Sequence, residues 1–161
     1  YLSIVNKMKK ISPEIKFSSD FIVGYPGETD KDFEDTIDLI KKVNFVNSFS
    51  FIYNKRPGTP ASNLKSVDKN LQQKRLVTIQ NLLKEIQKEK NKKSIGKLKK
   101  VLIENKVKNQ NKFFGRTVEL TPVFVETNDK DVGKIIDVEI FDYNQNSLFG
   151  SKAISSKEVA A

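Results

Sequence analysis

Residues 20–29 place a short apolar strand, a Gly/Pro turn and a helix start in direct succession, which constrains the fold of the first half of the chain. Residues 21–23 are β-favouring, as in a buried parallel strand, and we expect the whole strand to cover 15–24. The residues that break it are Gly24, Pro26 and Gly27. Thr29 is placed as an N-cap, and Asp32 stands where a capping box has an acid. A helix over 29–43 follows, so this stretch predicts one βα unit.

A second unit of the same kind comes next. Residues 48–53 alternate in polarity and predict a strand, with one face formed by Phe49, Phe51 and Tyr53. A Pro/Gly loop over 54–60 leads to a predicted helix over 68–93. If the two strands are parallel neighbours, the loops after them share one rim. Two units are too few to close an α/β barrel, so we expect them to be its last part.

From Gly96 the spacing of apolar residues changes from helical to alternating. Five short β-like runs, separated by turn-prone clusters, cover residues 98–104, 116–121, 123–126, 134–140 and 147–153. Five strands in so short a stretch predict a small β-barrel of the oligonucleotide-binding kind. The fold class is therefore α/β followed by all-β. The predicted divisions of the chain are 1–93 for the α/β part, 94–154 for the barrel and 155–161 for a tail.

Cysteine and histidine are both absent from the 161 residues. Their absence excludes disulfides, removes the two commonest soft metal ligands and rules out a His-dependent nucleophilic triad within this chain. We therefore predict no catalytic residue and no metal ligand here. The chain has no long apolar run or signal-like segment, which favours a cytoplasmic protein without a membrane partner. It begins at Tyr1, inside an expected helix, which is typical of a piece of a longer polypeptide.

The net charge is +9, and the positive charge is concentrated between Lys84 and Lys112, where eleven Lys face three Glu. Clustered Lys indicates a polyanion partner, although such a run is also typical of a solvated helix face. Residues 113–117, Phe-Phe-Gly-Arg-Thr, follow directly. Aromatic rings beside cations suit unpaired RNA. We expect one of Phe113 and Phe114 to fill the barrel core and Gly115 to permit a bulge.

The two loops of the first half also offer charged groups at the expected rim. Asp20, the stretch 24–28 and the stretch 56–59 combine a carboxylate, free amides and a guanidinium. Such a set can hold a charged, ribose-bearing small molecule. The simpler alternatives are that Glu28 only favours a helix start and that Arg56 is an ordinary surface residue.

Three motifs in this order resemble the radical-SAM methylthiotransferases of tRNA, and the MiaB type in particular. They are residues 18–29, residues 49–53 with 56–61, and Phe-Gly-Arg-Thr at 114–117. The stretch 146–150, Asn-Ser-Leu-Phe-Gly, is also similar, so the resemblance covers essentially the whole chain.

The resemblance implies an enzyme with an amino-terminal methylthiotransferase domain, a central radical-SAM partial barrel and a carboxyl-terminal TRAM β-barrel that binds tRNA. Such an enzyme converts isopentenyladenosine beside the anticodon to its 2-methylthio form. It uses S-adenosylmethionine and two 4Fe-4S clusters, and we expect the full-length protein to be a monomer. This chain would be the last two βα units and the TRAM barrel, and its partners would be tRNA and the missing amino-terminal portion.

The resemblance also implies roles for particular residues. Those matching the S-adenosylmethionine or substrate pocket are Asp20, Gly24, Gly27, Glu28, Phe51, Tyr53 and Arg56. Those expected to face tRNA, from the basic segment and the TRAM signature together, are Lys97, Lys99, Lys100, Lys112, Phe114, Arg116 and Thr117. The wider superfamily has Gly-x-Ile-x-Gly-x-x-Glu at the first strand. Here Asp20 replaces the first Gly, and Glu28 stands one residue late.

The family's clusters need cysteines that this chain does not contain, so we expect no methylthiolation by the chain alone. Two alternatives stay open. One is a stand-alone RNA-binding or scaffolding module from a truncated or split gene. The other is a related methylthiotransferase that acts on threonylcarbamoyladenosine or on a ribosomal protein.

Overall fold

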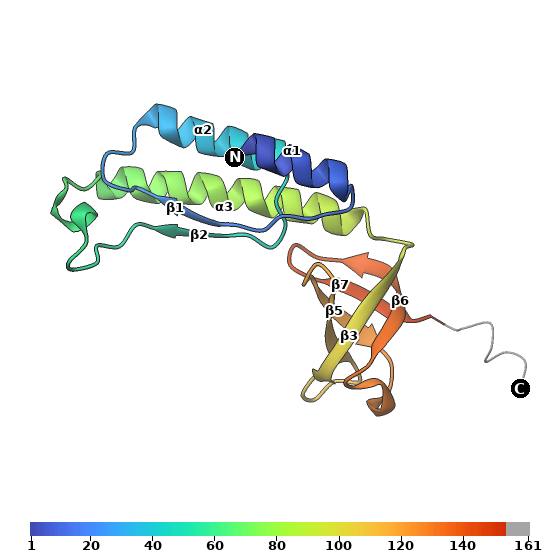
Figure 1. The fold of residues 1–161 in the computed structure, drawn as a ribbon. Coiled ribbons are helices and arrows are strands. Elements are labelled where there is room, and N and C mark those ends of the chain that lie inside the picture. Colours follow the sequence, from blue (N-terminus) through green and yellow to red (C-terminus); the bar gives the residue numbers. More distant parts are fainter. Residues whose placement is uncertain (154–161) are drawn as a thin grey trace, which may run out of the picture. The chain divides into compact units, whose positions relative to one another are not determined.

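A computed structural model describes residues 1–153, so the predicted tail over 155–161 lies outside the described residues. The chain forms two compact units, Tyr1–Ile86 and Gln87–Ala161. Figure 1 shows the order of the elements along the chain.

The first unit contains two parallel strands and three helices. Its elements are α1 (Leu2–Ile11), β1 (Asp20–Val23), α2 (Asp30–Val43), β2 (Phe49–Ile52), the 3₁₀ turn η1 (Pro60–Asn63) and the start of α3 (Lys69–Lys92). β1 and β2 pair in parallel, from Asp20 opposite Phe49 to Val23 opposite Ile52. This pairing confirms the two predicted βα units. Thr29 caps α2 and forms the expected capping box with Asp32.

The first strand is shorter than predicted, because regular pairing begins only at Asp20 rather than at residue 15. Residues 15–19 run beside the α2–β2 connection, in which Asn44 and Asn47 have positive φ angles. Such a backbone is not extended and offers no continuous ladder to a neighbouring strand. The contact there is reduced to single bonds, such as the 2.8 Å bond from the Val46 amide to the Phe17 carbonyl.

The core of this unit lies on one face of the strand pair. Phe21 and Val23 alternate inward and pack with residues of the helices and the α2–β2 connection, the buried members being Val5, Ile40, Val43, Phe45 and Ile79. Figure 1 shows the helices along one side of the two strands. Ile22 and Phe51 pair on the opposite face and are 55% and 51% exposed. We call this opposite surface the helix-free face.

The second unit is a closed barrel. Its elements are β3 (Leu98–Lys106), β4 (Phe113–Thr117), β5 (Pro122–Glu126), the 3₁₀ turn η2 (Asp129–Asp131), β6 (Ile135–Tyr143) and β7 (Leu148–Lys152). The strands follow the order β3-β4-β5-β7-β6, and only β5 and β7 run parallel to each other. The predicted five-stranded barrel is therefore confirmed. Alternating residues fill its interior: Val101, Ile103, Phe113, Val123, Val125, Val138, Ile140 and Leu148.

The predicted second strand of the barrel, 116–121, was placed too late. β4 ends at Thr117, and the Leu120 amide bonds the Thr117 carbonyl at 2.9 Å to close a turn. Leu120 has a φ angle of 64°, a left-handed conformation that no regular strand contains. β-favouring side chains at 118–121 therefore occupy a hairpin turn, since pairing with β5 decides where the strand stops.

Gly115 lies in β4 beside a β-bulge, as the sequence predicts, and the bulge is in the neighbouring strand β3. The register of β3 against β4 shifts between Ile103 and Asn105, where Ile103 pairs with Gly115. A Cβ atom at Gly115 would lie 2.4 Å from the Leu102 carbonyl oxygen. The bulge therefore brings the two backbones too close for any side chain.

Among residues 1–153, no helix is long and apolar enough to span a membrane.

Candidate functional sites

The loop after β1 has a defined turn geometry. The Glu28 amide bonds the Tyr25 carbonyl at 2.9 Å, with Pro26 and Gly27 at the two central positions. Gly27 has a φ angle of 89°, which a type II turn requires at its third residue. Gly24 also has a positive φ angle, of 72°. The two glycines of the motif thus turn the chain from β1 into α2.

Two side chains of α3 hold this loop in place. Arg75, which is buried, donates to Glu28 Oε2 and to Asp30 Oδ1, both at 2.6 Å. Glu28 Oε2 also accepts from the Gly24 amide at 2.8 Å. Gln72 Nε2 donates to the Gly24 carbonyl at 3.2 Å. Burial disfavours the charged form, but the bonds to the two carboxylates outweigh it and leave the pKa of Arg75 above its ordinary value.

Sequence reasoning missed both Gln72 and Arg75. The signal was present, because these residues lie seven and four positions before Ile79 and therefore share the core-facing stripe of α3. A polar residue on an apolar stripe must find a buried partner, and here the partner is the loop after β1.

The predicted pocket residues lie in three places. Asp20 and Phe51 belong to the helix-free face by strand register, and Tyr53 directly follows the end of β2. The Tyr53 hydroxyl is buried and has no hydrogen-bond partner among the described residues, and its ring lies 5.0 Å from that of Tyr25. Glu28 instead lies against Arg75, as described above, and Arg56 is exposed in the loop after β2.

On the barrel, the two adjacent phenylalanines separate as expected. Phe113 is buried in the core, and Phe114 points outward. Thr117 is also buried, and its hydroxyl accepts the Thr121 amide at 3.2 Å within the turn. The prediction that one of the two rings fills the core is confirmed.

Three outward phenylalanines form a continuous line across neighbouring strands, which we call the aromatic row: Phe114 of β4, Phe124 of β5 and Phe149 of β7. Phe114 pairs with Phe124, and Phe124 with Phe149, in the strand register. The ring centroids are 5.8 Å and 5.6 Å apart, and the second pair is stacked. Arg116 lies 5.2 Å from the Phe114 centroid, and the Lys112 ammonium lies 5.8 Å from that of Phe149.

Acidic neighbours partly neutralise the charges of several predicted basic residues. Lys99 lies 3.4 Å from Glu119, and Lys100 lies 3.3 Å from Asp137. Arg116 Nε lies 3.0 Å from Glu104. Lys97, just before β3, is exposed. Since most of these side chains remain partly exposed, each ion pair can exchange its carboxylate for a phosphate at modest cost.

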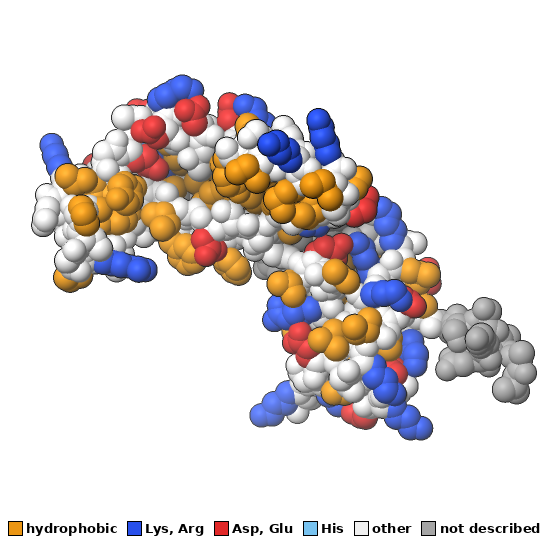
Figure 2. Space-filling model, in the orientation of Figure 1, with side chains coloured by type: hydrophobic (Ala, Val, Ile, Leu, Met, Phe, Trp, Pro, Cys, Tyr) orange, Lys and Arg blue, Asp and Glu red, His pale blue; other side chains and the backbone are white. Residues whose placement is uncertain are grey.

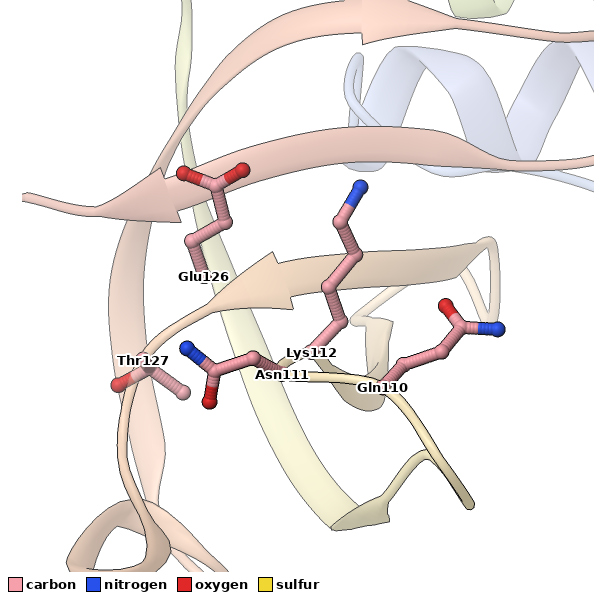
Figure 3. A pocket seen from close by; sticks show the side chains of 5 residues that line it. All are labelled: Gln110, Asn111, Lys112, Glu126 and Thr127. Carbon is pink, nitrogen blue, oxygen red and sulfur yellow. The ribbon is translucent and has the colours of Figure 1, made fainter.

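An open hollow of about 500 Å³ lies at the Lys112 end of β4. It is lined by Gln110, Asn111, Lys112, Glu126 and Thr127. Figure 3 shows Lys112 and Glu126 extending in the same direction above the two amides. Among the described residues, no three His, Cys, Asp or Glu side chains gather as a metal site.

The chain is similar to known proteins along its whole length. Residues 92–153 match the TRAM domain family. The chain is 49% identical over 161 residues to the tRNA-2-methylthio-N(6)-dimethylallyladenosine synthase of Pelagibacter ubique, covering 100% of this chain and 36% of the relative. It is 44% identical to the synthase of the same name from the Culex pipiens Wolbachia, covering 95% of this chain and 36% of the relative.

A third synthase of that name, from Alcanivorax borkumensis, is 42% identical, with 94% of this chain and 35% of the relative covered. The chain thus spans about a third of the length of these relatives. With the TRAM match on the closed barrel and the paired βα units before it, the chain matches, along its whole length, the carboxyl-terminal part of MiaB-type tRNA methylthiotransferases.

Proposed function

We propose that this chain is the tRNA-binding, carboxyl-terminal part of an enzyme that methylthiolates isopentenyladenosine beside the anticodon of tRNA. The observation that carries the proposal is the match of the entire chain to synthases named for that product. The cytoplasmic location and the monomeric state of the full-length protein belong to the same proposal.

The barrel supplies tRNA binding in this proposal. Its support is the TRAM match together with basic side chains around outward rings. Phosphates take the cations, since neutralising phosphates releases condensed counterions. The residues proposed to contact tRNA are Lys97, Lys99, Lys100, Lys112, Phe114 and Arg116, while buried Thr117 shapes the turn beside them.

The first unit supplies part of the S-adenosylmethionine or substrate pocket. Asp20 and Phe51 on the helix-free face offer a carboxylate for a ribose or amino group and a ring for a base. The buried, unpartnered Tyr53 hydroxyl fits a polar group of such a ligand. Gly24, Gly27 and Glu28 shape the adjoining loop, and exposed Arg56 can reach a carboxylate.

S-adenosylmethionine would supply the methyl group when bound, as the family resemblance implies. The two 4Fe-4S clusters do not fit this chain, because it contains no cysteine. We therefore assign their ligands to the amino-terminal portion and expect the 161-residue chain alone to produce no methylthiolated tRNA.

Titration of the chain with tRNA at increasing salt tests the proposal. We expect affinity to fall steeply with salt, and the slope to become shallower in the triple variant Lys99→Ala, Lys100→Ala, Arg116→Ala, because fewer counterions are released. The control removes three exposed charges from the first unit (Lys7→Ala, Lys41→Ala and Lys42→Ala) and should keep the parent slope. Affinity that is unchanged when salt is tripled would contradict tRNA binding through these residues.

A further inference from the structure

The aromatic row places apolar rings on the outer surface of the barrel, where they do not belong to its core. Its three phenylalanines point away from the interior, which already has its own eight-residue core. They are partly rather than fully exposed, because each ring covers the edge or face of its neighbour. The strand register places them on three adjacent strands, so the rings form one continuous surface rather than scattered contacts.

The two ends of the row carry cations. The Arg116 guanidinium is near Phe114 at one end, and the Lys112 ammonium is near Phe149 at the other. The open hollow begins at Lys112 and adds the amides of Gln110 and Asn111. A surface of rings flanked by cations and amides matches the chemistry of a nucleotide, which has an apolar face, polar edges and an anionic phosphate.

We infer that the aromatic row is a stacking site for unpaired bases of RNA, in which Phe124 and Phe149 act with Phe114. The inference rests on the proposed tRNA binding and names the part of the RNA that the barrel recognises. In an A-form duplex the bases already stack on one another, so the accessible minor groove presents base edges and 2′-hydroxyls but no free base faces. Rings therefore add affinity only where bases are free to leave their stack, as in a loop or a single strand.

The row differs from other exposed rings of the barrel. Phe141 on β6 is 50% exposed and is not a member of the row. It serves as a matched control, since it has the same side chain on the outer surface of the same barrel. Figure 2 shows that hydrophobic side chains also occur elsewhere on the surface, so apolar exposure alone does not mark the site.

The experiment measures binding of the full chain to two fluorescent RNAs by anisotropy. One is a single strand of about 12 nucleotides, within the span that one such barrel covers, and the other is a blunt duplex of matching sequence. The variants are Phe124→Leu, Phe149→Leu and the control Phe141→Leu. Leucine keeps apolar bulk but cannot stack, and Phe124→Tyr restores a ring. Thermal melts establish that each variant folds.

We expect Phe124→Leu and Phe149→Leu to weaken single-strand binding by about 5-fold or more, with an unchanged salt slope. The affinity of these variants for the duplex should stay close to that of the parent. Phe124→Tyr and Phe141→Leu should also bind the single strand about as tightly as the parent. Folded Leu variants that bind the single strand as tightly as the parent would overturn the stacking site and leave tRNA binding intact. Equal losses of affinity for the duplex and the single strand would have the same meaning. A parent chain that binds neither these RNAs nor tRNA would overturn both proposals together.

Discussion

Asp131 illustrates how one buried carboxylate ties the barrel together. It is 4% exposed, accepts a hydrogen bond from the Thr127 hydroxyl and lies 3.2 Å from the Lys152 ammonium. The bond from Thr127 and then the charge of Lys152 hold its pKa below the ordinary 3.8, against the opposing effect of burial. A carboxylate whose pKa is lowered by folding stabilises the folded state above its unfolded pKa.

This stabilisation should disappear as the pH falls through the folded-state pKa of Asp131, below 3.8. We expect Asp131→Asn to lower the melting temperature of the barrel at pH 7. The melting temperature of this variant should also fall less than that of the parent when the solution is acidified. Circular dichroism melts at pH 7 and at a pH below 3.8 measure both effects. The exposed neighbour Asp129 provides the control Asp129→Asn, with little expected change at pH 7. Equal acid sensitivity in the parent and Asp131→Asn would contradict the role of Asp131.

At the scale of elements, α3 is more than a covering helix, because it fixes the loop between β1 and α2. Arg75 is 3% exposed and Glu28 is 10% exposed, so their ion pair is shielded from water. Replacing Arg75 by Met keeps the bulk but leaves the Glu28 carboxylate without its partner. Breaking one side of a buried pair costs about 3 kcal/mol.

We therefore expect Arg75→Met to destabilise the first unit by about 3 kcal/mol in chemical denaturation. Its exposed neighbour gives the control Lys74→Met, which removes the same charge from the same helix and should cost far less. Adding Glu28→Gln to Arg75→Met should recover part of the loss, because the carboxylate left without Arg75 is then only that of exposed Asp30. If both single Met variants unfold alike, the Arg75–Glu28 pair does not hold the loop.

For the whole molecule, the division between the two units falls inside α3, after Ile86. The last turns of this helix belong to the barrel unit. Asn91 is 2% exposed, and its amide nitrogen donates to the Asn144 carbonyl at 3.0 Å and to the Gln145 carbonyl at 3.3 Å. These bonds satisfy carbonyls in the connection between β6 and β7, so the helix end stabilises the barrel.

A fragment covering 87–153 should therefore melt cooperatively and at a higher temperature than one covering 98–153. Asn91→Ala in the longer fragment should reduce this difference in melting temperature.

A fragment covering 1–86 should be poorly soluble, since its helix-free face exposes Ile22, Phe49 and Phe51 and its strands have free edges. Calorimetry and sedimentation of the three fragments measure these differences. A soluble, monomeric 1–86 with a sharp melt would contradict the second expectation.

Local patterns were sufficient for much of this fold. The capping box at Thr29, the turn at Gly27 and the alternating runs after Gly96 each depend on neighbours within a few residues, and all were predictable. The end of β4 at Thr117 was not, because residues 118–121 favour strand and only pairing with β5 imposes the turn.

The order of the elements, the charge of the basic segment and the lack of cysteine ligands for a cluster follow from composition and short-range spacing alone. Short-range patterns do not predict that Glu28 contacts Arg75, 47 positions away, or that three phenylalanines from separate strands form one row. Contacts between distant residues depend on strand register and helix packing. A one-residue slip of β5 or β7 would turn Phe124 or Phe149 inward and interrupt the row.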